Sequence, residues 1–400
     1  MATIIQNNKT IYFLFDFFWA IVLFPKPVQL VVLLGFMLYF MNVKLIISKD
    51  KFALTQLIVL GIYAISIIFN AIISFHELTR VLAAVNTILI TFTAINLYIF
   101  FSTVQIDTSR VGKSFLFNTG VLLLFLLIYL FYPAKESLTI MGYSVSAIDY
   151  IKASGTRFVG FFAYSNLIPL FSIVSIPFIT DYFNKREIYS FGIIVLNFIF
   201  SYFANSRSGQ INMLFITAFF VYDYLKLKVK KGIRKLYVLI AVTIIAILGL
   251  VAFPYILAKI NYMFSSRAAS NSMRFAIYQN SIEKMIDNNP IIGMGIKDLY
   301  GDSIYPYGSH STYIGYFYKT GILGGCLYIQ SIIIYLCRIT KWKKRTLTDF
   351  VYFISAIALF FWMVLEDLDG TNWSICYAYT MLGIIRSRSQ NYIILQVKTQ

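Results

Sequence analysis

Repeated apolar runs, each about twenty residues long, constrain this 400-residue chain more than any other feature of it. Hydrophobic residues make up 59% of the chain, aromatic residues make up 18%, and the mean hydropathy is +0.74. A water-soluble domain is much less apolar. A run of this length can cross the hydrocarbon core of a bilayer as a helix. The sequence therefore predicts an all-α, polytopic integral membrane protein.

The apolar runs predict about twelve transmembrane helices. They are expected near residues 11–24, 28–47, 52–74, 80–102, 114–132, 160–179, 188–204, 209–225, 236–257, 312–337, 348–365 and 372–386. Pro169 and Pro177 interrupt one of these segments, and prolines are expected to kink a membrane helix rather than end it. No tandem repeat, Gly/Ser linker or low-complexity stretch divides the chain, so residues 1–400 are predicted to form a single transmembrane domain.

The basic residues predict how the helices are oriented. The net charge of +17 does not indicate a nucleic-acid partner, because most Lys and Arg residues stand in short loops beside apolar runs. The clusters at 226–235 and 338–345 are expected on the cytoplasmic side, together with both termini. The polar segment 258–311 between these clusters is then a large extracytoplasmic loop.

Loops on a rigid scaffold commonly carry function, and four arginines are expected on the outer side of this protein. They are Arg157, Arg207, Arg267 and Arg274. Each alone fits a solvated loop charge, and Arg207 also fits a snorkelling side chain in a tight turn. The four together lie on a face that the orientation rule depletes of basic residues. They therefore favour binding of an anionic substrate, and phosphate suits the guanidinium fork.

The two histidines are interpreted differently. His310 stands between Ser309 and Ser311 at the start of an apolar run. An unperturbed imidazole titrates near neutrality and can accept a proton from a hydroxyl group, but an interfacial histidine fits the same position. His76 has no second histidine at helical spacing, so it is expected to be an interfacial residue rather than a zinc ligand.

Other possible metal ligands are few. The pair Asp367-x-Asp369 in an outer turn can hold Mg²⁺ against a diphosphate, or it can be an ordinary acidic turn. The three cysteines fall in or near predicted helices without paired spacing, so packing roles are expected for them, with no disulfide or thiolate metal site.

Several short motifs resemble the core of the O-antigen polymerase and O-antigen ligase superfamily. In chain order they are Arg157-x-x-Gly160 with Ser165-Asn166, Asn205-Ser-Arg207-Ser-Gly209, Arg274 followed by Pro290-Ile-Ile-Gly293-x-Gly295, His310-Ser-Thr-Tyr, and Gly321-Ile-Leu-Gly324. Their order and spacing agree with the superfamily from about residue 157 to 325. The usual His-Asn is His310-Ser311 here, so no role is carried over for that asparagine.

The resemblance implies a glycosyltransferase of the bacterial cytoplasmic membrane that works on the extracytoplasmic face. It would transfer a glycan from a polyprenyl-diphosphate carrier to a sugar hydroxyl, and a direct displacement would invert the anomeric centre. His310 is then the expected catalytic base. The expected diphosphate ligands are Arg157, Arg207, Arg267 and Arg274. No cofactor or metal is expected, and a flippase and a chain-length regulator are candidate partners besides the lipid-linked oligosaccharide and the bilayer.

Alternatives remain at this point. A polymerase of O-antigen, capsule or exopolysaccharide repeat units is favoured, because the chain is divergent and rich in Phe, Ile, Lys and Asn. An O-antigen ligase would instead transfer the polymer to a lipid core. A flippase or other transporter predicts charges along a pathway within the helices, and it often shows internal repeats. A structural membrane protein without catalysis leaves the outer arginines unexplained.

Overall fold

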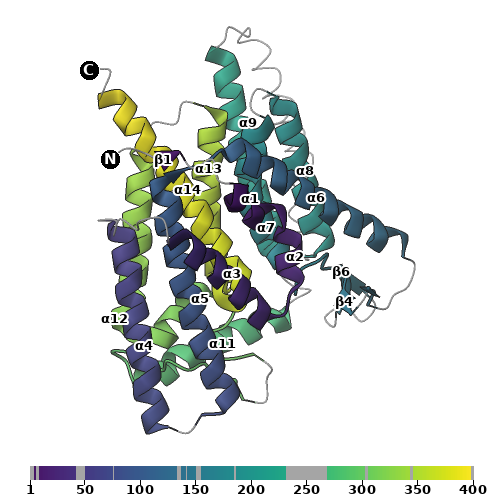
Figure 1. The fold of residues 1–400 in the computed structure, drawn as a ribbon. Coiled ribbons are helices and arrows are strands. Elements are labelled where there is room, and N and C mark those ends of the chain that lie inside the picture. Colours follow the sequence, from purple (N-terminus) through teal and green to yellow (C-terminus); the bar gives the residue numbers. More distant parts are fainter. Residues whose placement is uncertain are drawn as a thin grey trace.

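The computed structural model describes residues 4–5, 9–41, 50–74, 76–132, 137–140, 142–149, 155–183, 186–230, 268–301, 305–342 and 346–397. The expected helix 236–257 and the candidate ligand Arg267 lie outside these residues. The described chain is mostly helical (Figure 1). Its helices are α1 (Lys9–Asp16), α2 (Phe18–Leu23), α3 (Lys26–Met41), α4 (Lys51–Ile73), α5 (Leu78–Thr103), α6 (Thr108–Phe131), α7 (Leu167–Phe183), α8 (Glu187–Phe203), α9 (Arg207–Lys230), α11 (Ala268–Asn288), α12 (Thr312–Thr340), α13 (Leu347–Leu365), a 3-10 turn η1 (Leu368–Gly370) and α14 (Asn372–Val397).

Five helices of the described chain are long and apolar enough to cross a membrane, namely α4, α5, α6, α12 and α13. Helices α3, α7 and α8 are apolar but shorter. The expected helix 11–24 is divided into α1 and α2, because the backbone leaves the helical conformation at Phe17 (φ −101°, ψ 21°). The chain is thus an all-α membrane protein in its main elements, as the apolar runs predict.

The helices pack around α14. Residues 371–385 are all buried, and this helix lies along α5 and also contacts α3, α7 and α13. A helix that is apolar all round belongs in the centre of a bundle rather than on its surface. Aromatic rings fill the space beside it. Phe18, for example, packs against Tyr377 with ring centroids 4.7 Å apart and against Phe171 at 5.3 Å.

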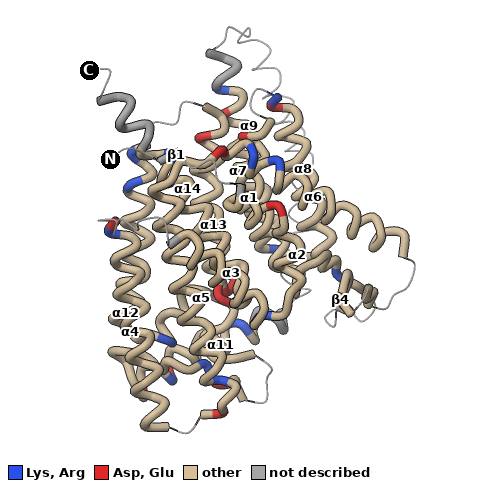
Figure 2. The backbone as a smooth tube through the Cα atoms, in the orientation of Figure 1, with Lys and Arg blue, Asp and Glu red and all other residues tan. Residues whose placement is uncertain are grey.

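Ion pairs hold the bundle together at the end where α4 and α13 begin. Asp50 lies 2.7 Å from Arg338 of α12 and 3.3 Å from Arg386 of α14. Arg388 of α14 lies 2.9 Å from Asp181 of α7. Figure 2 shows that charged residues gather mainly toward the two ends of the bundle, which leaves the length of α4 and most of α12 apolar.

Short strands accompany the helices. β1 (Ile4–Ile5) pairs in parallel with β2 (Val104–Gln105), β3 (Thr139–Ile140) pairs with β4 (Tyr143–Ser144), and β5 (Ser146–Asp149) pairs with β6 (Gly155–Phe158), the last two antiparallel. The expected helix 160–179 therefore begins later, at Leu167. The strand β6 and the left-handed turn at Gly160 (φ 66°) take up the residues before it.

Candidate functional site

A cavity of about 1090 Å³ lies at the end of the bundle that carries α11, opposite to the ion pairs of Asp50. Segments far apart in the sequence line it. They are the starts of α3 and α5, the β5–β6 hairpin, residues 163–166, α11, Lys297, Tyr305, Pro306, Ser309, His310 and the turn between α13 and α14. Cations outnumber anions in this lining. Its titratable Lys, Arg, His, Asp and Glu residues are Lys26, Arg80, Arg157, Arg274, Lys297, His310, Glu366, Asp367 and Asp369.

One face of α11 carries Arg274 and also contacts the turn of His310. Arg274, Tyr278 and Ser281 follow one another at four- and three-residue spacing, which places them on the same side of a helix. The Tyr278 hydroxyl donates to the carbonyl oxygen of His310 at 2.6 Å. The Ser281 hydroxyl accepts a hydrogen bond from the backbone N–H of Gly308 at 2.8 Å. The helix that carries Arg274 thus also holds the turn that carries His310.

Glu366 orients Arg274 from the other side. Nη2 of Arg274 lies 3.3 Å from Oε1 of Glu366, and Nη1 donates to the carbonyl oxygen of Leu365 at 3.2 Å. The amide of Asn166 donates to the same Glu366 oxygen at 2.8 Å. Burial raises the pKa of the Glu366 carboxyl, although the charge of Arg274 and the hydrogen bond from Asn166 oppose this effect. Arg274 is therefore held by two acceptors, and a guanidinium has further donors for a ligand.

His310 has an unusual backbone and a perturbed imidazole. Its φ of 64° lies in the left-handed region, which a residue other than glycine seldom adopts. Ser311 then caps α12 by accepting from the N–H of Ile314 at 3.5 Å. Burial, followed by the charges of Arg274 and Lys297, lowers the pKa of His310 to about 4. The imidazole is consequently neutral at physiological pH and can accept a proton.

Two glycine motifs form one backbone contact. Gly321 (φ 65°, ψ −168°) interrupts α12, and the N–H of Ile322 donates to the carbonyl oxygen of Pro290 at 2.8 Å. A Cβ on Gly321 would lie 2.3 Å from the carbonyl oxygen of Ile291, and one on Gly293 would lie 2.3 Å from the nitrogen of Gly321. Only glycine fits at both positions. This contact fixes the start of the loop that leads to Lys297 and His310.

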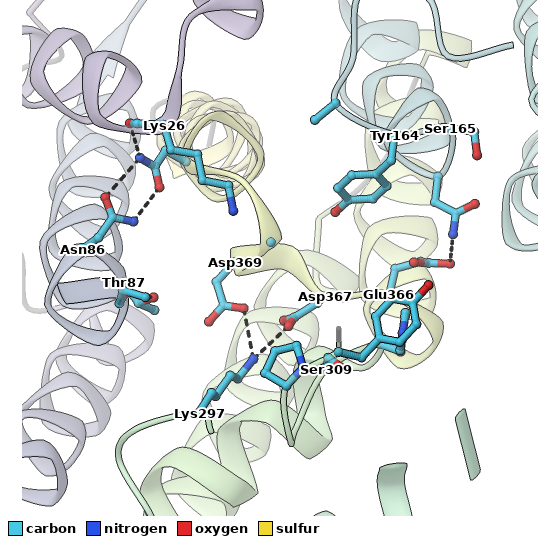
Figure 3. Close-up of a pocket in the computed structure, with 18 of the residues that line it drawn as sticks. Lys26, Asn86, Thr87, Tyr164, Ser165, Lys297, Ser309, Glu366, Asp367 and Asp369 are labelled. Carbon is cyan, nitrogen blue, oxygen red and sulfur yellow. Dashed lines mark hydrogen bonds and ion pairs between the residues drawn. The ribbon is translucent and has the colours of Figure 1, made fainter. Parts of the chain in front are cut away.

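Two lysines form ion pairs with the aspartates of the turn between α13 and α14. Nζ of Lys297 lies 2.8 Å from Oδ2 of Asp367 and 3.7 Å from Oδ1 of Asp369 (Figure 3). Lys319 of α12 pairs with the other oxygen of Asp369. Burial and the neighbouring Asp369 raise the pKa of Asp367 to about 7. Burial works against ionisation of Asp369, but the charges of Lys297 and Lys319 outweigh it and hold the pKa of Asp369 low.

The same lysines bear on the hypothesis of a Mg²⁺ ion at Asp367-x-Asp369. Both carboxylates already have an ammonium partner, so a divalent ion would have to displace Lys297 or Lys319. Among the described residues, no group of three or more His, Cys, Asp or Glu side chains is arranged as a metal site.

Arg207 is the first residue of α9. The hydroxyl of Ser206 accepts from the N–H of Gly209 at 3.3 Å and so caps this helix, and Asn205 adopts a left-handed turn (φ 51°) just before it. A Cβ on Gly209 would lie 2.3 Å from Cγ of Pro169, so the absence of a side chain lets α9 approach α7 closely. Arg207 does not itself line the cavity.

Three of the predicted arginines nevertheless share one electrostatic environment. Burial, and then the charges of Arg274 and Arg157, lower the pKa of the Arg207 guanidinium. Arg157 lies in β6, paired opposite Ala147 of β5, and it lines the cavity together with Arg274. Arg157, Arg274 and His310 thus line one cavity, the charges of Arg157 and Arg274 act on Arg207, and Arg267 lies outside the described residues.

Sequence reasoning gave no role to several cavity residues. Lys297 and Glu366 fall in predicted outer segments, and this position is the only feature of the sequence that indicates a functional role for them. Lys26 and Arg80 come from the N-terminal part of the chain and match no motif. The side chain of His76, for which an interfacial position is expected, is 5% exposed, and its Nδ1 lies 2.9 Å from Oδ1 of Asp298.

Comparison with known proteins adds one match. Residues 192–329 match the family model described as O-Antigen ligase. The matched segment runs from α8 into α12 and contains Arg207, Arg274 and His310, whereas Arg157 and the turn at 366–370 lie outside it. The match supports the resemblance to the O-antigen polymerase and ligase superfamily that the short motifs indicate. No curated protein matches the chain.

Proposed function

From the match of residues 192–329 to the O-antigen ligase family, we propose that this protein is a membrane glycosyltransferase that uses a lipid-diphosphate sugar donor. The observation that carries the proposal is the shared face of α11, which holds the guanidinium of Arg274 and the turn of His310 at one cationic cavity. We favour a repeat-unit polymerase, with an O-antigen ligase as the second candidate.

The arginines would stabilise the leaving group. Cleavage of the bond between an anomeric carbon and a diphosphate places growing negative charge on the diphosphate oxygens. Preorganised donors near that charge lower the barrier, and each hydrogen bond to a charged group contributes about 1.5–3 kcal/mol. Arg274 is already oriented by Glu366 and Leu365, so little reorganisation is needed when the donor binds. Arg157, Arg207 and Arg267 are proposed to add to the positive electrostatic potential around the leaving diphosphate.

His310 would act as the general base. In the proposed step the acceptor hydroxyl oxygen forms a bond to the anomeric carbon while the bond from that carbon to the diphosphate oxygen breaks. The diphosphate leaves with the electron pair, and the hydroxyl proton passes to the neutral imidazole of His310. Attack opposite to the leaving group inverts the anomeric centre. The bound diphosphate also offsets the cationic charge around His310, which makes the imidazole more basic once the donor is present.

The proposed setting is the bacterial cytoplasmic membrane. We propose about twelve spans in a single transmembrane domain, with both termini cytoplasmic and the cavity on the extracytoplasmic side. The basic clusters near residues 226–235 and 338–345 support this orientation. A flippase would supply the polyprenyl-diphosphate-linked oligosaccharide, and a chain-length regulator is a further proposed partner.

The test of this function is an assay with purified components. The protein in nanodiscs would receive one polyprenyl-diphosphate-linked repeat unit, and a ladder of lipid-linked oligomers is expected on gel electrophoresis. Because Lys297 and Lys319 already neutralise the acidic turn, the ladder should persist in excess EDTA. A reaction that stops in EDTA and recovers with Mg²⁺ would move the catalytic role to Asp367 and Asp369. Product only with a lipid-core acceptor would identify a ligase.

A further inference from the structure

The cavity has a second cationic side, at the starts of α3 and α5. Figure 3 shows Lys26, Asn86 and Thr87 on one side of Asp367 and Asp369, and Tyr164 and Ser165 on the other. Arg80 of α5 lines the cavity with Lys26. The two cations come from the starts of α3 and α5, which lie outside both the family match and the resembling motifs.

These two cations differ from Arg274 and Lys297 of the same lining. Arg274 is paired with Glu366, and Lys297 is paired with Asp367. Within the described part of the chain, no hydrogen bond or ion pair is found for the side chain of Lys26 or of Arg80. The ammonium of Lys26 points into the open space above Asp369 in Figure 3.

The backbone that carries Lys26 is nevertheless held firmly. Asn372 donates to the carbonyl oxygen of Lys26 at 2.7 Å and exchanges hydrogen bonds with Asn86 at 2.9 and 3.2 Å. The side chain of Gln29 donates to the carbonyl oxygen of Phe24 at 2.8 Å, two residues before α3. A fixed backbone with an unpaired charged tip is suited to a ligand that brings the opposite charge.

The proposed reaction requires two substrates, and the base lines the cavity that both sides share. His310 lines the same cavity as Lys26, Arg80 and Arg274, and the Tyr278 hydroxyl of α11 donates to its carbonyl oxygen at 2.6 Å. Ser309 beside it is 8% exposed, lines the cavity, and its hydroxyl has no partner among the described residues. An unpaired buried hydroxyl next to the base is available to a sugar hydroxyl of the substrate.

We propose that Lys26 and Arg80 bind the diphosphate of the acceptor, so that both substrates are diphosphate-linked lipids. The donor diphosphate lies at Arg157 and Arg274, with Arg207 adding its charge from outside the lining, and the acceptor diphosphate lies across the acidic turn at Lys26 and Arg80. The sugars of the acceptor span the distance to His310, where the terminal hydroxyl is deprotonated. This inference rests on the proposed function and specifies its acceptor, because a polymerase needs a second carrier-linked substrate.

The experiment measures binding of the donor and of the acceptor independently. The donor is a polyprenyl-diphosphate oligosaccharide whose terminal acceptor hydroxyl is replaced by hydrogen, so that it can only donate. Two fluorescent acceptors carry the same sugars, one on a polyprenyl diphosphate and one on a neutral alkyl glycoside of similar length. KM for each acceptor and for the donor is measured with the protein in phosphatidylcholine nanodiscs for the wild type, for Lys26→Gln/Arg80→Gln and for the control Lys113→Gln. Lys113 is exposed and does not line the cavity.

The double variant should raise KM for the diphosphate acceptor by about tenfold to a hundredfold, since one or two charge-assisted hydrogen bonds are lost. KM for the donor and for the neutral acceptor should not change, and the control should match the wild type. Equal KM for both acceptors in the wild type, or a KM effect on the donor alone, would overturn the proposal.

The same experiment distinguishes two further outcomes. Lys26 and Arg80 could instead bind the headgroup of an anionic phospholipid. Wild-type activity would then depend on phosphatidylglycerol in the nanodisc and not on the acceptor diphosphate, and this result would contradict the proposal. If the wild type transfers sugar to neither acceptor, the proposed function fails first and the inference fails with it. Transfer to the neutral acceptor alone leaves the glycosyltransferase function standing and rejects the acceptor site.

Discussion

Arg274 and Glu366 stand 92 residues apart in the sequence and meet at 3.3 Å at the edge of the cavity. Glu366 is only 4% exposed, and its backbone ends α13 by donating to the carbonyl oxygen of Trp362. The carboxylate is therefore fixed by the bundle itself. It orients a guanidinium on α11, a helix whose place depends on the loop that precedes α12. The pair thus links the membrane-embedded helices to the segment that carries His310.

The first prediction concerns Arg274. Arg274→Ala should reduce polymer formation by at least about a hundredfold, because two charge-assisted contacts to the leaving diphosphate are lost. Arg274→Lys should restore only part of the activity, since an ammonium keeps the charge but cannot form the bidentate contact. The protein level in the membrane should stay near normal. Asp287→Ala, at an exposed position of the same helix, is the control and should be fully active.

The same substitution at Arg207 tests whether this arginine acts on the diphosphate together with Arg274. If Arg207→Ala has the same effect as Arg274→Ala, both act on the diphosphate. Full-length polymer from both alanine variants, observed as unchanged ladders on gels, would reject a role for the arginines in binding the leaving group.

The sequence predicts much of the site because its motifs are local. Arg207 is the first residue of α9 and His310 lies two residues before α12, and a polar residue at the start of a helix can be recognised from the apolar run that follows. The partners of these residues could not be predicted in the same way. That Lys297 pairs with Asp367 depends on how the loop of α11 folds back on the turn after α13, and no periodicity encodes that contact.

Two features of the fold escaped prediction for physical reasons. The apolar run 312–337 indicates one continuous helix, whereas a carbonyl from a distant loop meets the backbone at Gly321 and breaks it. The perturbed pKa of His310 also depends on burial and on Arg274 and Lys297, which are distant in sequence. The residue type indicates a base, but only the surroundings decide where it titrates.

A second prediction tests the contact between the glycine motifs. Gly321→Ala should lower the free energy of unfolding by more than about 2 kcal/mol, because a left-handed backbone costs an alanine about 1–2 kcal/mol and its Cβ would also overlap the carbonyl of Ile291. The measurement is thermal unfolding in detergent. Gly61→Ala in α4 is the matched control, because its Cβ would meet nothing within 4 Å. Equal melting temperatures for the two variants would show that the contact does not stabilise the fold.

A third prediction concerns membrane orientation. Single cysteines would be placed at Asp287 and at Lys230 in a variant whose three natural cysteines, of which Cys326 and Cys337 are exposed, are replaced by alanine. A membrane-impermeant maleimide added to intact cells should label position 287 and should reach position 230 only after the cells are opened. The reason is that the basic cluster near 226–235 retains its loop in the cytoplasm. Labelling of both positions from the same side would contradict the proposed topology.

The last prediction concerns the pH dependence that His310 imposes. An ordinary histidine would give an acid limb near neutrality, but burial, Arg274 and Lys297 lower the pKa of His310 to about 4 in the free protein. The base is the neutral imidazole, which is present above this pKa and is lost as the pH falls through it. The acid limb of kcat/KM, which reports the free enzyme, is therefore expected near pH 4.

The limb of kcat should lie at higher pH, because the donor diphosphate offsets the cationic charge around the imidazole in the complex. His310→Ala should lose about 10²–10⁴ in turnover together with this limb. Arg274→Gln removes one of the charges that lower the pKa of His310, so it should move the limb of kcat/KM upward even though its rate is low. His310→Ala with the wild-type pH profile would exclude the imidazole as the base. An unmoved limb in Arg274→Gln would show that Arg274 does not control its titration.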